Sequence, residues 1–214
     1  MAAGTISFGD VYFPTFGARW LASIERAYPK PDQVLLVSDR EWDVPSWVQL
    51  VVVPNRGFMM MNDFAEHCLC DWWVFSGLDD EYTQDAFVPI ESDADAVFFP
   101  CRQAGEANWV AQWSGPDAFR NTWQLPNNPQ NGGVVFRLSS LREVPVRDYI
   151  YADEVQWSEW SYFGLTADFD PRIRVIWHRW HGSTSWPANR AGEQQAQDFK
   201  RRLREGLIRK GVPE

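Results

Sequence analysis

The sequence predicts an α/β fold: a mixed, mainly parallel central sheet flanked by helices, with an amphipathic helix near the C-terminal end. Continuous, valine-rich runs of strand length alternate with segments of helical periodicity, as in sheets that helices cover on both faces. The apolar run over 71–77 gives way to Asp79-Asp80-Glu81, which puts carboxylates where ligands bind in open α/β sheets. Residues 192–210 carry apolar side chains on one side only, the pattern of an amphipathic helix.

The first half of the chain supplies most of the parallel sheet. The predicted strand over 5–8 precedes a polar turn, and the apolar spacing of residues 16–28 predicts a helix that Pro29 ends. The further strands are continuous apolar runs that stop at a polar residue or a turn. The remaining elements of this half are strands over 33–38, 48–53 and 71–77 and a helix over 59–69.

The second half alternates strands with aromatic and polar segments. Asparagine and proline predict a loop over 117–129, and the spacing of three aromatic residues predicts a helix over 153–164. The other elements are strands over 96–100, 108–113, 134–137 and 172–177, a short helix or turn over 139–144, a polar loop over 178–187 and the helix over 192–210. Because no repeat or low-complexity linker interrupts the chain, residues 1–214 are predicted to form one domain.

Composition excludes several classes of protein. The chain is 45% hydrophobic with a mean hydropathy of −0.39, and no apolar run approaches the ~20 residues of a membrane span. Residues 1–5 lack the basic, then apolar, start of a signal peptide. We therefore expect a cytoplasmic protein without a membrane partner, whose three cysteines are reduced. The oligomeric state stays open.

Charge is unevenly distributed along the chain. The net charge of −9 argues against a broad basic face for nucleic acid. Seven basic and four acidic residues nevertheless give residues 189–214 a charge of +3, and leave −12 for the rest. That tail is either a solvated helix face or a polyanion contact. The 13 tryptophans can stack on sugars or on bases and do not distinguish the two.

Three consecutive acids form the most informative motif. Asp79, Asp80 and Glu81 follow a buried strand, and carboxylates are the hard oxygen ligands that Mg²⁺ and Mn²⁺ prefer. A cation held there would bridge to phosphates. The alternative is a solvated acidic loop.

The order of further motifs resembles that of GT-A fold glycosyltransferases, in particular the family-2-like group and its small phage-encoded, DNA-modifying members. After the acids come Gly132-Gly133-x-x-x-Arg137, the pair Asp153-Glu154, and two late histidines, His178 and His181. The resemblance covers the chain to about residue 186. It departs from the family at Glu81, where the last Asp of an Asp-x-Asp element is usual.

The resemblance implies three sets of site residues. Asp153 or Glu154 would be the base, and Asp79 and Glu81 would bind Mn²⁺ or Mg²⁺ with His178 or His181. The implied nucleotide-sugar contacts are Phe8, Asp10, Asp39, Arg56, Asp79, Asp80, Gly132, Gly133 and Arg137. Residues 1–90 would bind the nucleotide sugar, 91–188 would carry the acceptor and catalytic half, and 189–214 would form the basic tail helix. Each of these residues could instead have a purely structural role, in a turn, a helix cap or a surface ion pair.

The implied reaction moves a sugar from a nucleoside diphosphate sugar, UDP-sugar first, to an acceptor hydroxyl. A cation would stabilise the departing diphosphate, and a carboxylate would take the acceptor proton. Direct displacement would invert the anomeric centre. The first candidate acceptor is a 5-hydroxymethylpyrimidine in phage DNA, in the host cytoplasm. The alternatives are a capsid protein or small glycan as acceptor, a non-catalytic nucleotide-sugar-binding module, and a nucleotide-sugar phosphohydrolase.

Overall fold

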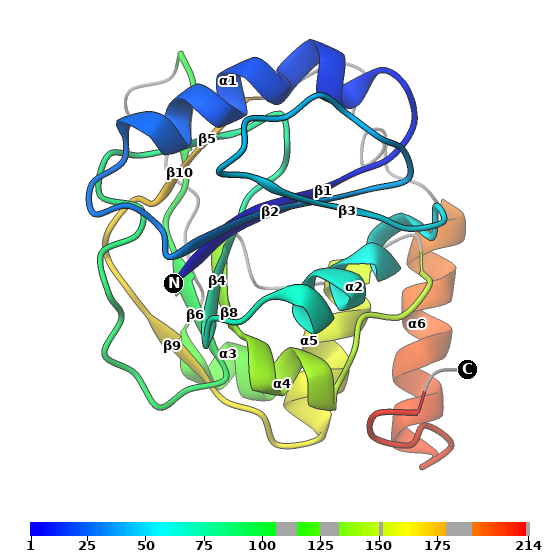
Figure 1. Cartoon of the computed structure of the whole chain (residues 1–214). Helices are drawn as coiled ribbons and strands as arrows, with labels where there is room; N and C mark the ends of the chain where they lie inside the picture. Colours follow the sequence, from blue (N-terminus) through cyan, green and yellow to red (C-terminus); the bar gives the residue numbers. More distant parts are fainter. Residues whose placement is uncertain (106–114, 125–132, 150–151, 179–189, 213–214) are drawn as a thin grey trace.

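A computed structural model describes residues 1–105, 115–124, 133–149, 152–178 and 190–212 (Figure 1). Within these residues the chain forms a seven-stranded sheet and a three-stranded sheet. The larger has the spatial order β3 (Gln49–Val52), β2 (Gln33–Ser38), β1 (Ala2–Ser7), β4 (Trp72–Phe75), β8 (Gly133–Arg137), β6 (Ala96–Phe99) and β9 (Ala167–Phe169). The smaller has the order β5 (Glu81–Tyr82), β10 (Val175–Trp177) and β7 (Arg102–Gln103).

Helices cover both faces of the large sheet. Helix α1 (Tyr12–Arg26) lies along one face, and α2 (Met60–His67), α4 (Leu138–Glu143) and α5 (Ala152–Tyr162) lie on the other (Figure 1). Helix α6 (Arg190–Arg204) packs beyond α5, and the short elements η1 (Gly57–Met59), α3 (Pro116–Arg120) and η2 (Thr122–Gln124) connect these parts. The predicted α/β class, with a mainly parallel sheet and a C-terminal helix, is confirmed.

Alternation along the strands divides the interior into two cores. In β2, Val34 and Leu36 belong to the core under α1, while Leu35 and Val37 belong to the core under α2, α4 and α5. Both sets are buried because successive strand side chains point to opposite faces of a covered sheet. The continuous apolar run that predicted the strand is the direct consequence.

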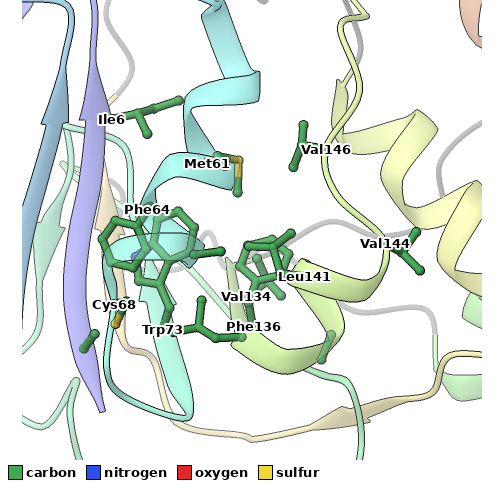
Figure 2. Close-up of a cluster of buried hydrophobic side chains, with 14 of the residues drawn as sticks. Ile6, Met61, Phe64, Cys68, Trp73, Val134, Phe136, Leu141, Val144 and Val146 are labelled. Carbon is green, nitrogen blue, oxygen red and sulfur yellow. The ribbon is translucent and has the colours of Figure 1, made fainter. Parts of the chain in front are cut away.

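Close aromatic packing fixes α2 against the sheet. Phe64 of α2 stacks on Trp73 of β4, with ring centroids 3.8 Å apart, and Figure 2 shows the two rings beside Met61. Gly4 of β1 lies directly beneath them: a Cβ there would stand 1.9 Å from Phe64 Cε2. A residue without a side chain is therefore required for this approach of helix to sheet.

Strand β8 gives the sheet its mixed character. It runs antiparallel to both neighbours, with Val135 opposite Val74 of β4 and opposite Val97 of β6. The pairs β1–β2, β2–β3, β1–β4 and β6–β9 are parallel. The amino end of β8 therefore lies at the same edge of the sheet as the carboxyl ends of the parallel strands.

Several predicted elements need correction. Residues 117–129 were expected to be a loop, but Pro116 starts α3 and Phe119 packs into the core, so part of this segment is helical. The last helix ends at Arg204, short of the predicted residue 210, before a turn in which Gly206 has φ +68°. Strands β5, β7 and β9 were not predicted. The predicted strand over 108–113 lies outside the described residues.

None of the helices in the described ranges combines the length and the apolar character needed to cross a membrane.

Candidate functional site

Polar residues collect at the carboxyl edge of the parallel strands. Gly9 and Asp10 follow β1, Asp39 follows β2, and Asp79 lies beyond the end of β4. Since β1, β2 and β4 are parallel neighbours, their carboxyl ends share one edge. This is the edge at which open α/β sheets bind ligands.

Asp39 closes the turn that follows β1. Its Oδ1 and Oδ2 accept hydrogen bonds from the Gly9 amide at 3.2 and 3.0 Å, and Arg40 Nε lies 3.2 Å from Oδ1. Burial alone would raise the pKa of Asp39, but the Gly9 amide and the Arg40 guanidinium lower it below the usual value. The carboxylate is thus held charged and oriented at the edge, where its remaining lone pairs can accept further hydrogen bonds.

Asp80 is a buried link between two distant segments. Its Oδ2 accepts from the Gly77 amide at 3.2 Å and its Oδ1 from the His178 amide at 3.0 Å. Burial, followed by the negative charge of Asp79, raises the pKa of Asp80 to about 8, against the opposing effect of the two amides. Asp80 therefore joins the acidic turn to the end of β10.

The raised pKa of Asp80 predicts pH-dependent stability. The folded state holds this proton more tightly than the unfolded chain, so the stabilisation is present below pH ~4 and lost as pH rises through about 8. We expect Asp80→Asn to gain stability relative to the parent across that window. Urea unfolding of both proteins between pH 4 and 8.5, without divalent ions, measures the difference; a difference that stays constant with pH would contradict the prediction.

Asp79 is the half-buried carboxylate of the turn. Among the described residues, no other side chain makes a hydrogen bond or ion pair with its carboxylate, although Arg19 donates to its main-chain oxygen. Burial raises the pKa of Asp79, while its own amide, Arg19 and His178 act in the opposite direction. Burial, followed by the charge of Asp79, also raises the pKa of Tyr12. Asp79 thus keeps lone pairs for a ligand beside two cationic or protonatable groups.

Glu81 and His178 meet through the small sheet. The register pairs Glu81 of β5 with Ile176 of β10, two residues before His178. Glu81 Oε1 lies 2.8 Å from His178 Nε2, and Glu81 Oε2 accepts from Arg26 at 2.8 Å. Two residues that were predicted to share a metal are therefore in contact, although 97 positions separate them.

The oxygen-rich donors fit a hard cation, but they do not form a complete protein cage. Across the described residues, no three His, Cys, Asp or Glu side chains are grouped closely enough to hold a metal. Asp79 offers a carboxylate, Glu81 is also paired with Arg26, and His181 lies outside the described residues. Such a set suits a cation that takes its other ligands from phosphates.

The two ends of the glycine motif lie at opposite edges of the sheet. Gly133 pairs with Phe99 at the end of β6, on the same side as Asp79, while Gly132 lies outside the described residues. Arg137 pairs with Trp72, the first residue of β4. Its guanidinium stacks 4.5 Å over the Trp72 ring and donates to the main-chain oxygens of Ser92 and Ala94 at 2.7 and 2.8 Å. The structure therefore does not bring Arg137 together with Asp79.

Phe8 belongs to an aromatic group at the carboxyl edge. It is half-buried, with its ring 6.1 Å from Tyr12 and 6.4 Å from Phe58. Asp10 beside it is exposed. Tyr12 and Phe58 were not predicted as site residues: Tyr12 begins α1 earlier than its apolar spacing indicated, and nothing in the sequence marks Phe58 as lying beside Phe8.

Arg56 follows β3, the neighbour of β2, and forms an ion pair with Asp63 of α2. Its side chain is 45% exposed, so the pair leaves part of the guanidinium open to solvent. Arg56 thus lies at the carboxyl edge, and strands β2 and β1 lie between its strand and β4, which precedes the acidic turn.

The acidic pair lies in the first turn of α5. Glu154 Oε1 is 2.6 Å from Lys200 Nζ of α6. The helix includes Asp153, whose side chain lies outside the described part of the structure. The pair is therefore on the face of the sheet that carries α2 and α4.

No protein-family model matches the sequence, and no curated protein matches it. Solved structures do match. S. aureus TarS 1–349 in complex with UDP-GlcNAc is 11% identical with a TM-score of 0.64, over 97% of this chain and 71% of that chain. The same fragment in complex with UDP is 12% identical with a TM-score of 0.60, over 94% and 71%.

A longer TarS structure is 9% identical with a TM-score of 0.59, and the match covers 83% of this chain but only 36% of that one. At such identities the likeness concerns the fold. The chain shares with these TarS structures a mixed α/β fold, in which helices flank a sheet of mainly parallel strands.

Proposed function

We propose that this chain is a glycosyltransferase that uses a nucleoside diphosphate sugar. The observation that carries the proposal is the likeness, over 97% of the chain, to a structure bound to UDP-GlcNAc. Carboxylates at the carboxyl edge of the parallel strands support it, because the oriented Asp39 and the half-buried Asp79 lie at the edge where open α/β sheets bind ligands. UDP is the first candidate for the nucleotide.

The proposed mechanism is a direct displacement with inversion. Asp39 accepts hydrogen bonds from the nucleoside, and Asp79 would hold a divalent cation. Mn²⁺ or Mg²⁺ bound there would act as a Lewis acid on the leaving diphosphate. Asp153 or Glu154 takes the proton of the acceptor hydroxyl as it attacks.

The other residues proposed to bind the cation differ in the contacts that they already make within the protein. Glu81 and His178 contact each other, and Glu81 also pairs with Arg26. His181 remains a proposed alternative to His178. The Gly132-Gly133 segment is proposed to let the main chain approach the donor sugar, since glycine removes a side chain from such a contact.

For the acceptor we propose a hydroxymethylated pyrimidine in phage DNA, which would place the enzyme in the host cytoplasm. The basic tail gives this acceptor limited support. Arg201 of α6 pairs with Asp198 and Glu205, and Lys210 pairs with Glu143, so part of the tail charge is already neutralised. Phosphate contacts would depend on Arg204 and Arg209, which are exposed.

The first test is thermal stabilisation by UDP, UDP-GlcNAc and other nucleotide sugars, each with and without Mn²⁺. A ligand that binds only the folded state raises the melting temperature, by an amount equivalent to about 2.7 kcal/mol at a hundred times its Kd. We expect a shift that needs both a nucleotide sugar and the metal. No shift with any nucleotide would contradict the proposal.

Product analysis then separates transfer from the alternatives. With the donor identified, sugar is expected to appear on hydroxymethylated DNA and not on unmodified DNA. Transfer to a capsid protein or a glycan instead would overturn the DNA acceptor alone. Release of free sugar phosphate in the absence of any acceptor would indicate a phosphohydrolase, and binding without turnover a non-catalytic module.

A further inference from the structure

Helix α6 buries a lysine against the acidic pair. The Lys200 side chain is 1% exposed, and its Nζ lies 2.6 Å from Oε1 of Glu154, which is 13% exposed. Lysine is almost never fully buried unless it is paired. The other basic side chains of this helix with described exposure, Arg201, Arg202 and Arg204, are exposed or half-buried. One cation of the predicted basic tail therefore points inward, toward α5.

Apolar contacts already provide a means of holding the two helices together. Val155 of α5 packs with Ala196, Phe199 and Leu203 of α6 in a separate buried cluster. A buried ion pair adds little net stability over apolar residues of similar size, because both charges lose their hydration. Docking of α6 alone does not require a lysine at this position, so the charge of Lys200 calls for another role.

Beyond its first turn, α5 also makes hydrogen bonds to residues outside α6. Glu159 forms two hydrogen bonds with Arg147, at 2.6 and 2.7 Å, and Gln156 and Trp160 donate to the Val144 main-chain oxygen at 2.9 and 3.0 Å. These contacts begin one turn or more after the start of the helix. The carboxylate of Glu154, in the first turn, is instead held by Lys200 from the neighbouring helix.

We propose that Lys200 is a positioning residue of the transfer reaction. By binding one oxygen of Glu154, it fixes the side chain of Glu154 and the first turn of α5, and so orients the acidic pair toward the acceptor. This inference rests on the proposed glycosyltransferase function. It makes α6 part of the catalytic unit, in contrast to the polyanion-binding tail that its charge suggested.

The chain offers a closely matched control. Lys210 Nζ also lies 2.6 Å from a glutamate oxygen, Oε1 of Glu143, but the two side chains are 37% and 59% exposed. Lys200→Met and Lys210→Met therefore each remove one ammonium from one such pair. Isothermal titration gives the Kd for UDP with Mn²⁺. Product formation gives kcat and KM, with the donor and acceptor that the two experiments under Proposed function identify.

For Lys200→Met we expect kcat to fall about 100-fold, the size of effect that a misplaced reacting group produces. The Kd for UDP should change less than about twofold, since Asp39 and Asp79 lie on other elements. Lys210→Met should match the parent in both. Lys200→Arg should recover part of kcat. A merely structural role for Lys200 would lower the melting temperature and leave kcat of the folded protein unchanged, which would overturn the inference.

Glu154→Leu with Lys200→Met covers the case in which Lys200→Met alone does not fold. It replaces both charges of the buried pair by apolar side chains, which folded proteins tolerate. It also removes the ion pair that holds the first turn of α5, so we expect a folded protein that binds UDP and transfers at least about 100-fold more slowly. Transfer by this variant at the parent rate would overturn the inference, whichever of Asp153 and Glu154 is the base. A parent protein that binds UDP but transfers nothing would instead show that the proposed function has failed.

Discussion

Asp79→Asn is expected to reduce sugar transfer at least about a thousandfold, because a Lewis-acid cation contributes several kcal/mol to stabilising a departing charge. The substitution removes the anionic oxygen of a carboxylate that no other described side chain binds. Mn²⁺-dependent binding of UDP should weaken in parallel. Transfer rates and UDP titrations with and without Mn²⁺ measure both effects.

The expected loss is not a loss of folding. Burial raises the pKa of Asp79, so its charge costs folding free energy at neutral pH, and the neutral amide should be tolerated or slightly stabilising. Asp71→Asn is the control, since Asp71 is exposed and precedes the amino end of the same strand, β4. If Asp79→Asn transferred sugar within about threefold of the parent, the proposed role of the acidic turn would be wrong.

Asp170→Ala is expected to destabilise the protein by about 3–5 kcal/mol, the cost of leaving a buried charge without its partner. Arg174 is fully buried, and its Nε and Nη2 donate to Asp170 Oδ2 at 2.8 and 2.6 Å. Arg174 also donates through Nη1 to the main-chain oxygens of Ala86 and Val88. This pair therefore anchors the segment that follows the acidic turn.

For a chain of this size the change corresponds to a fall of roughly 6–20 °C in melting temperature. Asp168→Ala is the matched control. Asp168 is exposed and accepts hydrogen bonds from Ser92 Oγ and the Phe169 amide at the same strand end. Replacing both partners with apolar residues, as Asp170→Leu with Arg174→Met, should recover much of the loss. A loss below about 1 kcal/mol for Asp170→Ala would contradict this account.

The pH dependence of the Asp170 contribution follows from its charge. Burial alone would raise the pKa of Asp170, but the hydrogen bonds and charges of Arg172 and Arg174 lower it below the usual value. A lowered folded pKa gives stability that is present above the unfolded pKa, near 4, and is lost as pH falls below it. The difference between parent and Asp170→Ala should therefore shrink in acid.

The strands of the parallel sheet were predictable because burial on both faces leaves an apolar signal in the sequence. Residues 33–38 were predicted with the bounds that β2 has. Strands of two or three residues, such as β5, β7 and β9, carry too little pattern for any periodicity. Proline and asparagine predicted a loop at 117–129 because both residues favour turns. Proline also favours the first turn of a helix, so these residues did not distinguish a loop from a short helix.

The sequence indicated which candidate residues lie at strand ends, but it did not indicate which of them are in contact. The sequence could not distinguish His178 from His181 as the partner of the acids. The contact of His178 with Glu81 depends on the register of β10 against β5, two strands that lie far apart in the chain. Lys200 was counted with the basic tail because net charge does not show where a side chain points. In the structure its side chain points inward, to Glu154.

Arg137 illustrates a constraint that could have been applied to the sequence. A strand advances ~3.3 Å per residue, so Gly133 and Arg137 at the two ends of β8 lie about 13 Å apart. Once residues 133–137 are taken as a strand, they cannot both lie at one edge of the sheet. The glycine end faces the acidic turn, and the arginine end supports the opposite edge by binding Ser92 and Ala94.

The reversal of β8 has a consequence for how such a protein can change during evolution. Strand β6 ends and β8 begins at the edge where Asp79 lies. The chain between Phe99 and Gly133 thus leaves and re-enters the large sheet at one side, and its described part contributes β7 to the small sheet and Phe119 to the core. Length changes that spare these two contacts leave the register of the large sheet unaltered, and long surface insertions cost little closure entropy. For the proposed transferase, acceptor preference could therefore diverge while the strands that carry Asp39 and Asp79 are kept.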